Sequence, residues 1–167
     1  MNYNKRELKE KNSIIHIGAE KTLQNVNLDF FFSYRIFPDI IMSFATQWIP
    51  EKRKMKIGDT IAQQVYIPPI KYFSQKIIFG VRINEIIDTP DRKGFSYETL
   101  EGHVERGLSS FLLENTPSGL VCRIQTFSEP ANSLVRFLGP LFSIPYQAYC
   151  TRKALENVKE LIRKQRL

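Results

Sequence analysis

The sequence predicts an α+β fold in which one long C-terminal helix lies against a curved antiparallel sheet. Residues 144–167 have the periodicity of an amphipathic helix. Several strand-like segments between residues 60 and 127 are separated by short turn signals, which is the pattern of a meander. The links are too short for helical crossovers, so the sheet should be antiparallel.

The expected C-terminal helix has one mostly apolar face and one charged face when its residues are placed at about 100° per residue. Each large apolar side chain that it buries is worth roughly 1.5–3 kcal/mol, so the helix needs a wide apolar partner surface. Ser143 can cap this helix, and Pro145 is tolerated in its first turn. Residues 132–142 are interrupted by Gly139-Pro140 and can form a kinked first section. The face that we expect to be buried carries Gln147, Cys150, Thr151, Ala154, Leu155, Val158, Leu161 and Ile162.

The N-terminal third of the chain gives weaker signals. Residues 1–12 are polar and charged, so we expect a flexible lead-in followed by a single domain over 13–167. A short strand is expected at 13–17. Apolar residues recur at steps of three and four through 22–37, which favours a helix that ends before Pro38. A strand through the aromatic residues of this stretch is the alternative.

The predicted sheet follows a weakly alternating apolar stretch at 40–49 and a charged turn at 51–56. Each of its strands ends at a turn signal such as Pro68-Pro69 or Gly119. A curved sheet wrapped around the last helix would bury the apolar faces of both, which is the helix-grip arrangement. The strands are expected at 60–67, 76–87, 95–100, 108–114 and 120–127.

Composition limits the class of protein. A chain of 167 residues with 43% hydrophobic residues can build one proper core. The formal charge of +7 comes from lysines and arginines that alternate with acids, which favours a solvated surface over a nucleic-acid partner. The polar N-terminus and the absence of a long apolar run predict a soluble, cytoplasmic protein without a membrane span. We expect no cofactor, and the oligomeric state stays open.

The cysteines and histidines do not indicate a reactive centre. Cys122 and Cys150 form no C-x-x-C pair, and Cys122 lies in an apolar strand, which favours a buried, inert thiol. His16 and His103 lack the carboxylate or thiol spacing of a metal site. Neither of the common glycine-rich phosphate-binding motifs is present.

The most distinctive stretch is residues 94–107, which read GFSYETLEGHVERG. This stretch resembles the hallmark F-x-Y-G-T-L-P-G-H-P-E-x-G of an uncharacterised domain-of-unknown-function family, number nineteen-ninety. The chain also carries segments that are similar to other parts of the family pattern. They are His16-Ile17-Gly18-Ala19, Phe127-Ser128-Glu129-Pro130 and Gly139-Pro140.

The sequence departs from that family at four positions, and the resemblance is thin before Arg92. Glu98 replaces the usual glycine, Glu101 and Val104 replace prolines, and Glu129 stands where an arginine is common. The family resembles the START and birch-pollen-allergen group of helix-grip proteins. The resemblance implies an internal cavity for an apolar or amphipathic small molecule.

His103 and Glu105 are two residues apart, so on a strand they share a face, with Tyr97 just across the turn. These three groups could fix the register of the hairpin through backbone hydrogen bonds, contact a ligand, or transfer protons. Gln147 and Thr151 are polar residues on the apolar helix face. They could orient the polar end of a ligand or bond to backbone carbonyls.

Three functions remain open from the sequence. The first, which we favour, is non-enzymatic binding of a small hydrophobic or amphipathic molecule, with Tyr97, His103, Glu105, Gln147 and Thr151 as ligand-binding candidates. The second is a cyclase-like or hydrolase-like enzyme that uses His103 and Glu105 as acid and base. The third is a module that binds an anionic surface through the cations of the last helix, which are Arg152, Lys153, Lys159, Arg163 and Lys164.

Overall fold

The computed structural model describes residues 8–67, 75–103, 105–130 and 133–165, with the backbone alone for 67, 75, 130 and 133–144. All strand pairs in this part of the chain are antiparallel, and the sheet order is β1-β7-β6-β5-β4-β3-β2. The elements in chain order are β1 (Lys9–Gly18), α1 (Asp29–Phe32), β2 (Met42–Thr46), β3 (Thr60–Ile67), β4 (Gln75–Asp88), β5 (Arg92–Thr99), β6 (Glu105–Thr116), β7 (Gly119–Pro130) and α2 (Ser133–Arg163).

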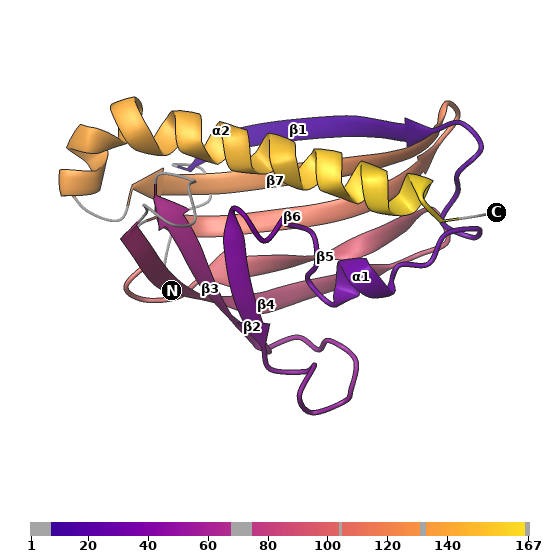
Figure 1. The fold of residues 1–167 in the computed structure, drawn as a ribbon, viewed down its shortest axis with the longest axis horizontal. Coiled ribbons are helices and arrows are strands. Elements are labelled where there is room, and N and C mark those ends of the chain that lie inside the picture. The colour runs from indigo at the N-terminus through magenta and orange to yellow at the C-terminus, as the bar shows by residue number, and fades with distance from the viewer. Residues whose placement is uncertain (1–7, 68–74, 104, 131–132, 166–167) are drawn as a thin grey trace.

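The sheet curves around α2. Figure 1 shows α2 running lengthwise over β1 and β7, while β2 and β3 stand at a steep angle to the middle of the sheet. The short helix α1 lies beside β5, near the C-terminal end of α2. The predicted α+β helix-grip architecture and its antiparallel sheet are therefore confirmed.

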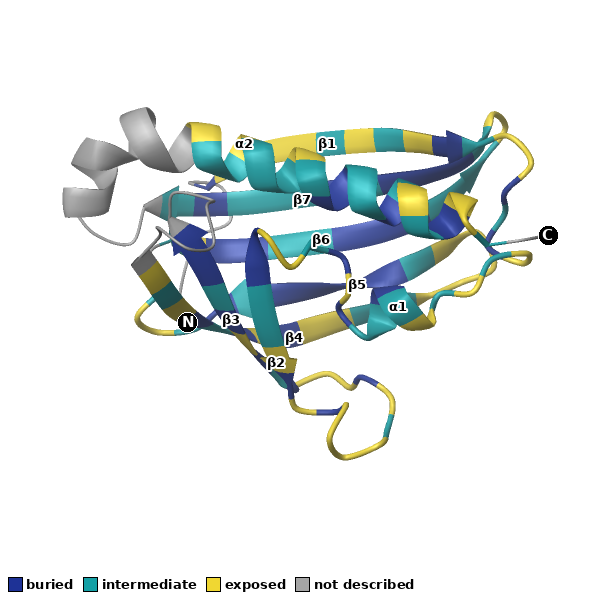
Figure 2. Cartoon of the chain, viewed as in Figure 1, coloured by how far each residue is buried: buried dark blue, intermediate teal, exposed yellow. Residues whose placement is uncertain are grey.

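The apolar stripe of α2 faces the sheet as its spacing predicts. Ala154, Leu155, Val158 and Ile162 are buried, and Figure 2 shows this buried stripe between exposed turns. The helix begins at Ser133, so it includes the first section that the sequence allowed before Gly139-Pro140 and does not start after Ser143. The capping role predicted for Ser143 is therefore wrong. A proline removes one helical hydrogen bond and can kink a helix without ending it.

The first strand also begins earlier than predicted. Residues 9–12 pair with residues 125–128 of β7, so they are not a lead-in, while residues 1–7 lie outside the described part. Backbone hydrogen bonds form the ladder whatever the side chains are. Charged side chains are common on such an edge strand, where they discourage pairing with a second sheet.

The helix predicted over 22–37 is wrong except for the single turn of α1. The side chain of Asn25 accepts a hydrogen bond from the amide of Thr22, and that of Asn27 accepts one from the amide of Asp29. These bonds hold the chain in turns before α1. After α1, Tyr34 has a left-handed backbone with φ of 63°, which stops the helix. The apolar spacing arises because an irregular segment fills the core with aromatic side chains.

The core lies between the sheet and the segments that cover it. Phe95 and Phe111 lie on neighbouring strands, and their rings stack with centroids 5.3 Å apart. Phe31 packs edge-on against Phe95, and the ring of Tyr34 is tilted to it. Four of the five predicted strands are longer than expected, and β3 has the predicted bounds. The Pro68-Pro69 turn that was expected to end β3 lies outside the described residues.

Candidate functional site

The inner face of the sheet changes character along its strands. Near the C-terminal half of α2, the inward residues are large and apolar, and they share one core cluster with the buried stripe of the helix. Toward the other end, the inward residues become more polar. One cross-strand row shows the change, since Tyr97 is paired with Ser109, Ser109 with Thr126, and Thr126 with Lys11. The apolar members of the inner face include Phe111, Leu113, Cys122, Ile124 and Ile15.

The first described side chains of α2 lie over this polar region. Gln147 reaches both sides of it, because Lys11 Nζ donates to Gln147 Oε1 at 2.7 Å and Gln147 Nε2 donates to Glu105 Oε1. Tyr146 Oη donates to the carbonyl of Tyr66 at 2.8 Å. The helix is therefore tied to β1, β3 and β6 at this end by polar contacts.

Tyr97 lies deep in the interior, in a group of neutral polar side chains. It is 8% exposed, and its phenol interacts with Tyr34, Gln63 and Ser109. Gln63 Nε2 donates to Tyr34 Oη at 2.6 Å, and Ser109 Oγ lies 3.3 Å from Thr126 Oγ1. Burial raises the pKa of both tyrosines, so both phenols are protonated at neutral pH.

His103 lies in the turn before β6, and its ring stabilises that turn. Its Nδ1 accepts a hydrogen bond from the amide of Glu105 at 3.0 Å, and the imidazole packs against Phe79 with centroids 4.6 Å apart. Burial lowers the pKa of His103, although the nearby Glu105 charge opposes this effect. The imidazole is therefore neutral at pH 7, with its proton on Nε2 because Nδ1 is the acceptor.

Glu105 connects most of the residues that the sequence singled out. Its amide bonds to His103, its carboxylate accepts from Gln147, and its negative charge helps to raise the pKa of Tyr97. The structure thus brings Tyr97, His103 and Gln147 together around Glu105. Thr151 lies one turn further along α2 and is half-buried. Whether any of the five contacts a ligand stays a prediction.

Three further members of this region were missed by the sequence reasoning. Lys11 belonged to the expected lead-in, and Tyr34 belonged to the expected helix. Gln63 left a weak signal, since it occupies an inward position between Ile61 and Val65 in a strand of alternating character. A polar residue in the buried phase of a strand is the pattern that could have indicated it.

The two thiols are unsuited to nucleophilic chemistry. Cys122 is buried, which raises its pKa to about 12, and burial raises the pKa of the half-buried Cys150 to about 11. Both are therefore protonated near neutral pH. Among the described residues, no three His, Cys, Asp or Glu side chains gather as a metal site would require.

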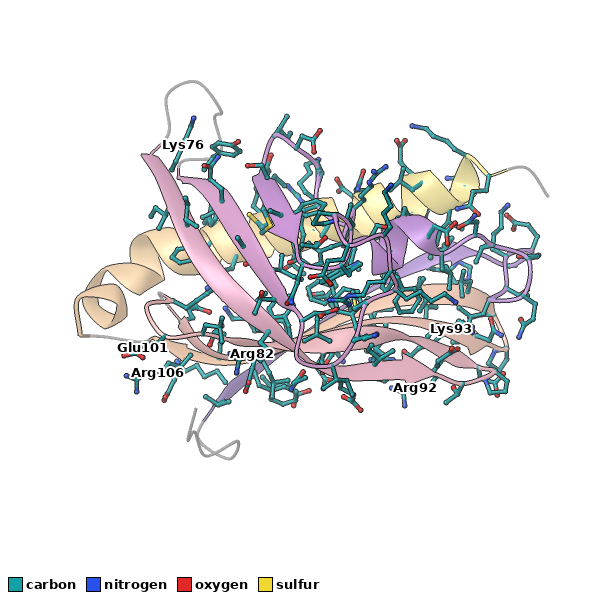
Figure 3. The ribbon with its side chains drawn as sticks, turned by 90° about the horizontal axis from the view of Figure 1, so that it is seen from below. Lys76, Arg82, Arg92, Lys93, Glu101 and Arg106 are labelled. Atoms are coloured by element: carbon teal, nitrogen blue, oxygen red, sulfur yellow. The ribbon has the colours of Figure 1, made fainter. Side chains whose placement is uncertain are left out.

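The surface cations are dispersed, and many are paired. Lys153 and Lys164 form ion pairs with Glu156 and Glu160 on α2 itself. Arg123 points away from α2 and bonds to Glu114 on the outer face of the sheet. Figure 3 shows Lys76 at one end of the sheet and Arg92 at the other. No helix in the described ranges has the length and apolar character needed to cross a lipid bilayer.

A hollow opens at the end of the molecule opposite the polar region. It has a volume of about 540 Å³ and lies outside the space between the sheet and α2. Its position gives it no contact with the five predicted residues. The lining residues are Leu23, Gln24, Asp88, Thr89, Pro90 and Lys93.

Comparison with known families decides which family this fold belongs to. Residues 21–157 match the family described as "Domain of unknown function (DUF1990)". The chain belongs to this family. The match covers the hallmark stretch, β2 to β7 and most of α2, so the resemblance noted at residues 94–107 is confirmed.

A curated relative and several solved structures are similar to the chain. The UPF0548 protein of Deinococcus radiodurans is 46% identical over 61 residues, which are 36% of this chain and 31% of that protein. The match thus spans about a third of that relative's length. The solution structure of KanY protein has a TM-score of 0.62 at 11% identity and covers 93% of this chain and 98% of its own.

A plant protein has the same architecture. The crystal structure of ginseng major latex-like protein 151 from Panax ginseng has a TM-score of 0.60 at 11% identity. The similarity covers 92% of the DUF1990 chain and 97% of the ginseng protein. At this identity the likeness shows a shared helix-grip fold and does not transfer a function.

Proposed function

We propose that this DUF1990 protein binds a small hydrophobic or amphipathic molecule between its sheet and α2, without catalysing a reaction. The observation that carries the proposal is the replacement of large apolar side chains by the small polar residues Ser109 and Thr126, next to the phenol of Tyr97, beneath the first described turns of α2. A solid core would favour apolar side chains at these inward positions, because burying polar groups costs free energy.

The polar groups converge as they do in ligand sites. Such sites are mostly apolar and contain a few polar groups that orient the ligand. Here the aromatic cluster around Phe95 and Phe111 forms the apolar side, and Tyr97 with Gln63 forms a polar patch next to it. A bound molecule could place its apolar body under α2 and its polar end against this patch.

The geometry of His103 supports binding rather than proton transfer. A general base needs a free lone pair that faces the reacting group. The Nδ1 lone pair of His103 is already used by the Glu105 amide, and one face of the ring is against Phe79. The proposal therefore assigns His103 to holding the turn that positions Glu105.

The test uses the uncharged fluorescent probe N-phenyl-1-naphthylamine with the purified protein. Binding should be saturable at about one probe per chain. Ser109→Phe should weaken binding at least tenfold, because its ring would occupy the inward space between Tyr97 and Thr126. Ser110→Phe is the matched control, since Ser110 lies on the opposite face of β6 and should leave binding unchanged.

Native mass spectrometry and circular dichroism complete the test. Circular dichroism checks that both variants keep the wild-type fold. The proposal is wrong if the wild-type protein shows neither saturable probe binding nor a bound molecule in its native mass spectrum. It is also wrong if folded Ser109→Phe and Ser110→Phe bind the probe like wild type.

A further inference from the structure

Residues 47–59 form the β2–β3 loop, which projects beyond the edge of the sheet (Figure 1). Figure 2 shows that most of this loop is exposed. The amide of Gln47 donates to the carbonyl of Thr60 at 3.1 Å, which holds the two ends of the loop side by side. The loop can therefore contact another surface while the sheet stays in water.

Internal contacts hold the β2–β3 loop in one conformation. Trp48 is 2% exposed, and its indole Nε1 donates to the carbonyl of Phe32 at 3.0 Å. Both carboxylate oxygens of Asp59 accept hydrogen bonds from the Arg53 guanidinium at 2.7 Å. A loop that is already ordered loses little conformational entropy when it binds, so it is suited to act as a docking surface.

Three lysines of this loop face solvent. Burial alternates from residue 52 to residue 56, and the exposed positions are Lys52, Lys54 and Lys56. In the described part of the chain, none of these lysines forms an ion pair. The two acids of the loop are both bound to Arg53 instead. The outward side of the loop therefore carries positive charge that is complementary to an anionic surface.

Two isoleucines flank these lysines and are exposed as well. Ile57 is 66% exposed and Ile49 is 43% exposed. Apolar side chains gain free energy when they leave water for an apolar medium. Binding at the headgroup region of a bilayer uses both properties, because buried apolar area and the attraction of cations to anionic lipids add together. The core of a protein–protein interface, by contrast, is depleted of lysine.

We propose that the β2–β3 loop docks the protein on the surface of an anionic lipid bilayer. Ile49 and Ile57 enter the headgroup region, and the three lysines contact lipid phosphate groups. This proposal differs from the anionic-surface module predicted from the sequence, which uses the cations of α2. Two of those cations, Lys153 and Lys164, are already paired with acids of the same helix. The docking is independent of whether a small molecule binds between the sheet and α2.

Sedimentation with lipid vesicles tests the wild-type protein. Vesicles of phosphatidylcholine with about one third phosphatidylglycerol should bind it about tenfold or more tightly than phosphatidylcholine alone, because each lysine near an anionic surface adds to the affinity. Binding should weaken about tenfold between roughly 50 and 500 mM NaCl, since salt screens exposed charges. No binding to the anionic vesicles would overturn the proposal, and that is the result expected if the loop contacts an acidic protein instead.

Charge-removal variants test whether the loop carries the binding. The loop variant combines Lys52→Gln, Lys54→Gln and Lys56→Gln. The matched control removes three exposed cations of α2 by Arg152→Gln, Arg163→Gln and Lys164→Gln. The loop variant should bind the anionic vesicles about tenfold more weakly than wild type, and the control should stay within about threefold of wild type. Equal losses in the two variants would overturn the assignment to the loop.

Apolar contact with the bilayer is tested at Ile57. Ile57→Ser should weaken binding by about threefold or more, while Ile14→Ser, at a 51% exposed position on the opposite edge strand β1, should leave it unchanged. Ile57→Trp should retain binding, because tryptophan favours the membrane interface, and its fluorescence emission should shift to shorter wavelength on anionic vesicles. Wild-type binding by Ile57→Ser, or an unshifted emission of Ile57→Trp, would overturn the proposal. Circular dichroism checks that every variant is folded.

Discussion

Gln165 binds the backbone of Asn27 with both ends of its side-chain amide. The amide of Asn27 donates to Gln165 Oε1 at 2.7 Å, and Gln165 Nε2 donates to the carbonyl of Asn27 at 2.9 Å. Lys21 Nζ also donates to the carbonyl of Gln165 at 2.9 Å. These bonds attach the C-terminal end of α2 to the irregular segment before α1. A single side chain therefore helps to hold this segment against the helix.

Removing this side chain should weaken the fold measurably. Gln165→Ala loses two hydrogen bonds, and each contributes about 1 kcal/mol, so the free energy of unfolding should fall by about 1–2 kcal/mol. Lys164→Ala is the control, because it removes only an exposed ion pair with Glu160. Urea denaturation measures both. Equal midpoints for the two variants would show that the Gln165 bonds add nothing.

The loop between β2 and β3 should make stability depend on pH. Arg53 Nη1 and Nη2 each donate to an Asp59 oxygen at 2.7 Å, and the amide of Lys56 donates to Asp59 Oδ2. The Arg53 guanidinium lowers the pKa of Asp59 below its ordinary value of 3.8. The ionised carboxylate is thus favoured in the folded state, so its stabilisation is full above that ordinary value and is lost as the pH falls through the lowered one.

Asp59→Asn should therefore reduce the free energy of unfolding by about 2 kcal/mol at pH 7, since it removes charge-assisted hydrogen bonds. The difference from wild type should shrink as the pH falls below about 4, where wild type loses the same interaction. Urea denaturation across this pH range measures it. Glu51→Gln, at an exposed partner of Arg53, should change little. A difference that stays constant with pH would contradict the explanation.

The hydrogen bond between Tyr34 and Gln63 should appear as a coupling energy. Tyr34→Phe removes the acceptor of Gln63 Nε2 in the buried core, which should cost about 1–3 kcal/mol. Gln63→Leu should relieve part of that cost in the double variant, because the amide that lost its partner is then absent. A double-mutant cycle by thermal denaturation measures the coupling. Strict additivity would contradict a direct interaction.

Two glycines with positive φ should respond differently to alanine. Gly102 has φ of 85°, and a Cβ there would meet open space, so Gly102→Ala should cost about 1–2 kcal/mol of backbone strain. Gly119 has φ of 107°, and its Cβ would lie 2.3 Å from the carbonyl oxygen of Gly18. Gly119→Ala should thus be more destabilising. Circular dichroism melting curves rank the two, and the reverse order would contradict the collision.

The interior polar region shows how far sequence reasoning reaches. Tyr97, Glu105 and Gln147 could be singled out because each breaks or marks a local pattern. Their meeting depends on how β6 and α2 pack, which no local pattern describes. Lys11 and Tyr34 were missed because the polar start of β1 does not look like a strand and the segment around α1 has helical spacing without being a helix.

The sequence by itself determined the long amphipathic helix and the antiparallel strands, because helical and strand periodicities and turn residues are local properties. It also determined the family, through the stretch at residues 94–107. Only the tertiary structure decided that β1 starts at Lys9, that α2 starts at Ser133, and that Glu105 lies between His103 and Gln147. Those outcomes depend on backbone pairing and long-range packing, whose free energy outweighs local preference.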